Sequence, residues 1–78
     1  MTAETRTRLE ALRDRGCAVV GPLREAPEDG GLRWYCVVVL PDGEEMKGRG
    51  ATDDEAAIAA ASRAEGSPQL DLLEPKDR

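Results

Sequence analysis

Residues 32–40, LRWYCVVVL, decide the fold of this chain. β-Branched and aromatic side chains dominate the stretch, and apolar residues recur at alternate positions, which is the pattern of a strand with one buried face. The set expected to face the core is Leu32, Trp34, Cys36, Val38 and Leu40.

The opposite set of alternate residues is less polar than a fully solvated face should be. Beside Arg33 it contains Tyr35, Val37 and Val39. These three residues predict a secondary interaction surface on the outside of the sheet. A second copy of the chain or a folded-back segment could cover it, so a homodimer is one expectation.

A tight turn and a polar strand follow. Pro41-Asp42-Gly43 predicts the turn, because proline presets φ and glycine accepts a positive φ. Residues 44–50, EEMKGRG, then alternate charged with small or apolar side chains. This alternation is typical of a solvated edge strand, so residues 32–50 predict an antiparallel hairpin.

A helix is predicted over residues 52–66. Thr52 and Glu55 have the spacing of a capping box, and three consecutive acids complement the positive end of the helix dipole. Gly66 and Pro68 end the helix. Its small-residue face, which can approach a sheet closely, is expected to consist of Ala57, Ala60, Ala61 and Ala64, with Ile58.

The N-terminal third adds a helix and a strand. Residues 2–16 predict a helix with Thr2 or Thr5 as its cap and Gly16 as its stop. Residues 17–23, CAVVGPL, predict a strand that Gly21-Pro22 bends or ends. The chain therefore predicts one α+β domain of order α-β-β-β-α over residues 1–66, with a three-stranded antiparallel sheet and both helices on one face. Residues 67–78 form a tail.

Composition limits the functions open to the chain. It has 78 residues and a net charge of −5, which opposes non-specific binding to nucleic acid or to anionic membrane. It has no histidine and only two cysteines, Cys17 and Cys36, so neither a general base of that kind nor a zinc site within one chain is available. We expect a non-enzymatic, cytoplasmic protein with no cofactor, no metal and two buried, reduced thiols.

The hairpin and second helix resemble the double-stranded-RNA-binding domain. Members of that family have the same element order and a G-x-G-x-S-x-x-E-A-x-x-x-A-A type segment, which appears here as Gly48, Gly50, Thr52, Glu55, Ala56, Ala60 and Ala61. The resemblance implies the fold. Family members that bind RNA place lysines where this chain has Asp53, Asp54 and Ala57, so duplex RNA binding is not expected.

The tail contains a second resemblance. Gln69-Leu70-Asp71-Leu72-Leu73 resembles the Q-L-[SD]-L-[FL] peptide by which bacterial polymerases and repair factors bind the replicative sliding clamp. The resemblance implies that Gln69 enters a polar subsite, that Leu70 makes a shallow contact and that Asp71 is a spacer. Leu72 and Leu73 would be the anchors in a hydrophobic pocket.

These patterns lead to a functional expectation with open alternatives. The chain is expected to be a protein-binding module that docks on the sliding clamp, as a replication or repair accessory or as an inhibitor of the kind phages encode. Alternatively, the three leucines of the tail pack on the sheet, and the domain binds nucleic acid or inhibits another protein.

Overall fold

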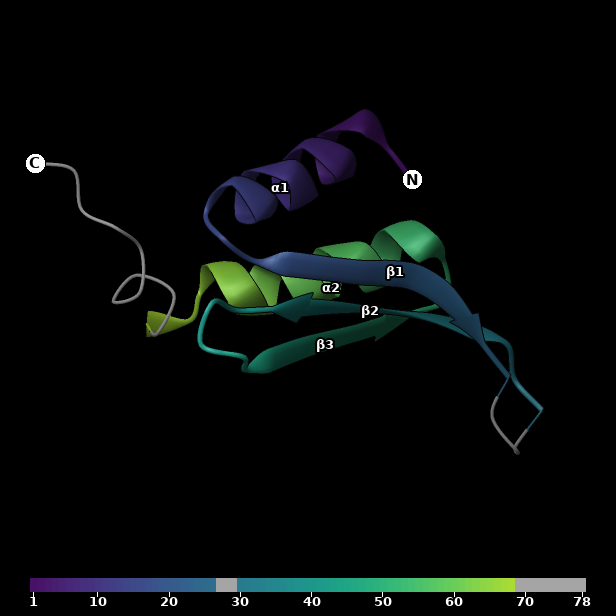
Figure 1. The fold of residues 1–78 in the computed structure, drawn as a ribbon. Helices are drawn as coiled ribbons and strands as arrows, with labels where there is room; N and C mark the ends of the chain where they lie inside the picture. Colours follow the sequence, from purple (N-terminus) through teal and green to yellow (C-terminus); the bar gives the residue numbers. More distant parts are fainter. Residues whose placement is uncertain (27–29, 69–78) are drawn as a thin grey trace, which may run out of the picture.

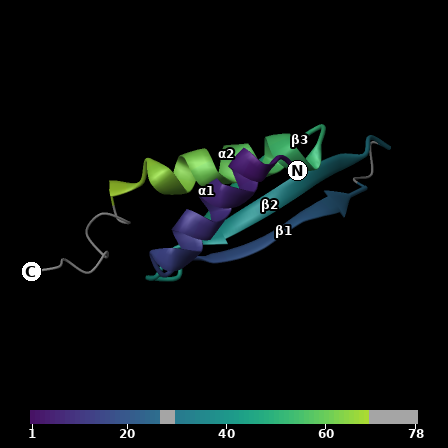
Figure 2. The same cartoon turned by 90° about the horizontal axis from the view of Figure 1, so that it is seen from above.

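The computed structural model describes residues 1–26 and 30–68, and its elements run in the predicted order. Both helices lie on the same side of the sheet in two perpendicular views (Figure 1, Figure 2). No element within the described part of the chain covers the opposite side. The elements are α1 (Ala3–Asp14), β1 (Ala18–Glu25), β2 (Arg33–Val39), β3 (Glu45–Gly50) and α2 (Asp53–Glu65). This is the expected α+β fold.

The sheet is antiparallel with strand order β1-β2-β3. The central strand pairs Val37 with Val20 on one side and with Lys47 on the other. The register between β1 and β2 shifts at Gly21-Pro22, where the peptide bond is cis and Gly21 has a φ of 92°. The strand bends there without ending, because pairing resumes at Leu23 opposite Tyr35.

Helix α1 is capped by one of the two residues expected for this role. The Thr2 hydroxyl accepts a hydrogen bond from the Thr5 backbone N–H at 3.2 Å, so Thr2 is the N-cap. Gly16 follows the helix with a φ of 97°, a conformation that favours glycine. Thr5, Leu9 and Leu12 form the buried side of the helix.

Helix α2 begins with a variant of the predicted capping box. Thr52 accepts from the Glu55 N–H at 3.1 Å, as expected. The Glu55 carboxylate reaches one residue further back than in the standard box, to the Ala51 N–H at 2.9 Å. Gly66 is the C-cap. Neither helix of the described chain is long and apolar enough to cross a membrane.

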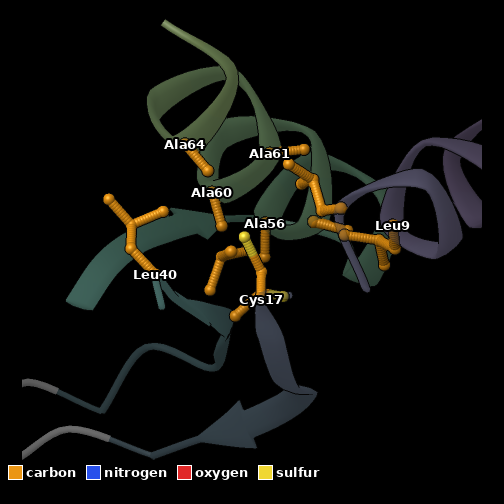
Figure 3. Close-up of a cluster of buried hydrophobic side chains, with 11 residues drawn as sticks. Leu9, Cys17, Leu40, Ala56, Ala60, Ala61 and Ala64 are labelled. Atoms are coloured by element: carbon orange, nitrogen blue, oxygen red, sulfur yellow. The ribbon is translucent and has the colours of Figure 1, made fainter. Parts of the chain in front are cut away.

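The core lies between the sheet and the two helices (Figure 3). α2 packs closely on β3 because the side chains on both contacting faces are small. A Cβ added to Gly48 would lie 2.7 Å from the Ala56 carbonyl oxygen and would also collide with the Ala60 backbone nitrogen. The buried cluster consists of Leu9, Leu12, Cys17, Cys36, Val38, Leu40, Ala56, Ala57, Ala60, Ala61 and Ala64.

Two predicted core positions were wrong. Leu32 is 63% exposed, because β2 begins at Arg33 and the strand pairing with β1 and β3 does not extend to residue 32. Ile58 is 36% exposed, and Ala56 takes a place on the buried side of α2 instead. The remaining predicted core residues of β2 are buried or partly buried on the helix side.

Candidate functional site

The start of helix α2 is the place where the RNA-binding members of the resembling family carry lysines and this chain carries acids. Asp54 Oδ1 accepts hydrogen bonds from the Thr2 backbone N–H at 3.0 Å and from the Thr2 hydroxyl at 3.3 Å. The amino group of Met1 lies 3.2 Å from Asp53 Oδ2. Both carboxylates therefore hold the start of α1 against the start of α2.

The electrostatics of this contact follow from its geometry. The hydrogen bond from the Thr2 backbone N–H, assisted by the Thr5 hydroxyl, lowers the pKa of Asp54 below its ordinary value of 3.8. Asp54 is thus ionised throughout the neutral range. A carboxylate at this place repels a phosphate group, whereas the lysines of the resembling family would attract one.

Arginine side chains also make contacts within the described part of the chain. Arg8 donates to both carboxylate oxygens of Glu65, at 3.1 and 2.6 Å, and so joins the two helices. The guanidinium of Arg24 lies 5.6 Å from the centre of the Trp34 ring. Arg49 Nε donates to Glu25 at 3.3 Å. These contacts occupy cations that an anionic ligand would otherwise meet.

The outer face of the sheet is the side that points away from the helices. Directly paired residues of antiparallel strands share a face, so the register identifies its members. They are Ala18, Val20, Leu23, Glu25, Arg33, Tyr35, Val37, Val39, Glu45, Lys47 and Arg49. The three residues predicted as a secondary surface, Tyr35, Val37 and Val39, lie in the middle row. Tyr35 and Val39 are partly exposed, whereas Val37 is only 8% exposed and so offers little surface to a partner.

The sequence alone missed two members of this outer face. Val20 is 45% exposed and Leu23 is 44% exposed, and they flank the bulge on β1. Strict alternation would place residues 20 and 23 on opposite faces. The extra residue at the bulge brings them to the same face. The Gly21-Pro22 pair was the available signal for this shift.

The thiols offer no reactive site. Cys17 and Cys36 are both free and buried, as expected. Burial raises the pKa of each thiol, which keeps the sulfur protonated and poorly nucleophilic. Within residues 1–26 and 30–68 there is no pocket and no cluster of side chains suited to hold a metal ion.

The tail motif, Gln69–Leu73, lies outside the described residues, so its partner-binding role stays a prediction. Comparison with protein-family models, with curated proteins and with solved structures finds no match for the chain. The resemblance to the double-stranded-RNA-binding domain therefore rests on the residues quoted above and on the order of the elements.

Proposed function

We propose that this protein is a non-enzymatic binding module that docks on the bacterial sliding clamp through Gln69–Leu73. The observation that carries the proposal is the five-residue match to Q-L-[SD]-L-[FL] directly after the folded domain. Helix α2 ends at Glu65, and the motif begins four residues later.

The composition of the tail supports this role. Leu70, Leu72 and Leu73 stand among polar residues after the helix stop formed by Gly66 and Pro68. Two or three apolar anchors on a short polar segment are what peptide-binding grooves recognise.

The chemistry of the motif suits an extended peptide in a preformed groove. Burial of the side chains of Leu72 and Leu73 contributes about 3–6 kcal/mol before the cost of ordering the peptide. Main-chain hydrogen bonds and the amide of Gln69 add to this. A dissociation constant in the micromolar range corresponds to about 8 kcal/mol, which these contributions can reach.

An enzymatic function has less support. The chain contains no histidine. Its buried thiols are held in the protonated form, and the acids at the start of α2 are engaged with the N-terminus of the chain. These features favour binding over catalysis.

The proposal is tested by calorimetry with the full-length chain and purified bacterial clamp. The wild type should bind with a micromolar dissociation constant, and replacement of both Leu72 and Leu73 by Ala should abolish measurable binding. Gln69→Ala should weaken it at least tenfold. Asp71→Ser is the matched control, because the motif accepts either residue at that position, and it should bind like the wild type.

A second measurement separates a displayed tail from a structural one. Deletion of residues 69–78 leaves Ser67, which is buried, in place. If the tail serves only a partner, the deletion should change the melting temperature by less than about 2 °C. Two results together would refute the proposal: the wild type does not bind the clamp, and the deletion lowers the melting temperature by several degrees. They would show that the leucines of the tail stabilise the folded domain.

A further inference from the structure

The folded domain leads into the tail motif with almost no linker. Gly66 is the C-cap of α2, and the next residue, Ser67, is 7% exposed and donates its backbone N–H to the Ala64 carbonyl at 3.2 Å. Pro68 alone stands between Ser67 and Gln69. Two residues of fully extended chain span about 7 Å at most. The motif therefore begins within about 7 Å of a buried residue of the domain, measured between Cα atoms.

Three parts of the domain lie at the end of the molecule where the tail starts. Helix α2 ends at the same end as the connection between α1 and β1 and the turn between β2 and β3, in both perpendicular views (Figure 1, Figure 2). Gly16 of the connection lies against the turn, because a Cβ built on Gly16 would be 3.4 Å from Pro41 Cγ. We call the exposed residues of these three parts the end surface. They are Gly16, Pro41, Asp42, Gly43, Glu44 and Gly66.

The end surface is fixed to the core of the domain. Leu40, which precedes the turn, is 2% exposed. Its carbonyl accepts a hydrogen bond from the Gly43 N–H and its N–H donates to the Glu44 carbonyl, both at 2.8 Å. At the last turn of α2, Arg8 of α1 holds the Glu65 carboxylate at 2.6 Å. A partner that binds the tail therefore meets a preformed surface beside it, and a contact with such a surface requires little ordering.

We propose that the end surface lies against the clamp, beside the groove that binds Gln69–Leu73. The inference rests on the proposed function and adds to it the part of the folded domain that the same partner contacts. A domain that hangs freely from a bound peptide needs a linker of several residues, because the reach of a flexible linker is only about 5–6 Å times the square root of its length. The single intervening residue of this chain, Pro68, also has a fixed φ, so it holds the domain at the rim of the groove.

A linker insertion tests the inference by calorimetry with the full chain and purified clamp. A flexible Gly-Ser segment of about ten residues between Pro68 and Gln69 keeps the domain and the motif intact but frees the domain from the rim of the groove. The dissociation constant should rise by about fivefold or more, because the contact of the end surface becomes a separate event that must be ordered. The matched control carries the same segment after Arg78 and should bind like the wild type. Thermal melts check that both variants fold.

Hydrogen exchange measured by mass spectrometry locates the contact. On addition of the clamp to the wild type, the amides of residues 42–44 should exchange more slowly, although these residues are distant from the motif along the chain. The amides of residues 3–8, at the start of α1, should exchange at an unchanged rate. In the linker variant, at a clamp concentration that saturates the motif, the protection of residues 42–44 should be lost.

The outcomes distinguish a failure of this inference from a failure of the proposed function. If the wild type binds the clamp and the linker variant binds equally well or more tightly, the motif is sufficient and the inference is overturned, while the proposed function stands. Equal exchange of residues 42–44 with and without bound clamp overturns the inference in the same way. If neither the wild type nor the linker variant binds the clamp, the proposed function fails and the inference fails with it.

Discussion

At the scale of single residues, two glycines of β3 determine how closely α2 approaches the sheet. A Cβ on Gly48 would collide with the backbone of α2 at Ala56 and Ala60, and one on Gly50 would collide with the first turn at Glu55. For Gly48 the colliding atoms belong to the backbone of α2, so no side-chain rotation relieves the collision. The G-x-G spacing that resembles an RNA-binding family thus has a packing function in this chain.

Gly48→Ala should therefore destabilise the fold by about 1–3 kcal/mol, because it overpacks the contact between α2 and β3. For a domain of this size, that corresponds to a melting temperature lower by roughly 4–20 °C. Gly66→Ala is the matched control, since the added Cβ would meet only the Ser62 carbonyl at 3.4 Å. Equal melting temperatures for Gly48→Ala and Gly66→Ala would show that α2 does not lie this close to β3.

Asp54 provides a residue-scale prediction about pH. Its folded-state pKa is lowered, chiefly by the Thr2 N–H, so its stabilising contribution is present above 3.8 and is lost as the pH falls through the lower folded-state value. Asp54→Asn should lower the melting temperature at pH 7. The difference from the wild type should narrow as the pH falls below 3.8 and the Asp54 carboxylate of the folded protein becomes protonated, because asparagine carries no charge at any pH. Thermal melts of both proteins from pH 7 to about pH 2.5 measure this, and a difference independent of pH would contradict it.

At the scale of elements, strong local patterns predicted the fold. The strand of β2 follows from its alternating apolar residues, and both helices begin at threonine caps whose hydrogen bonds the structure contains. The middle row of the outer face followed from the same alternation. These features depend on neighbours within a few residues, so the sequence carries them directly.

What the sequence did not predict depends on contacts distant along the chain. Ile58 and Ala56 both fit an alanine-rich helix by periodicity, and the close approach of Gly48 decides that only small residues face β3. Val20 and Leu23 share a face because of a bulge whose size is set by pairing with β2. The exposure of Leu32 likewise reflects where the pairing of β2 ends. The candidate binding site in the tail, Gln69–Leu73, was predicted from the sequence motif alone.

At the scale of the whole molecule, the distribution of charge argues against duplex RNA as a ligand. The net charge is −5, Asp53 and Asp54 occupy the start of α2, and Arg8 is paired with Glu65. Fluorescence anisotropy with a labelled duplex of about 20 base pairs should therefore show no binding at about 150 mM salt up to roughly 10 µM protein. A basic duplex-RNA-binding protein serves as the positive control for the probe. Salt-sensitive binding below that concentration would mean that the arginines of α1 outweigh the acids of α2, because the electrostatic attraction to phosphates is the term that salt weakens.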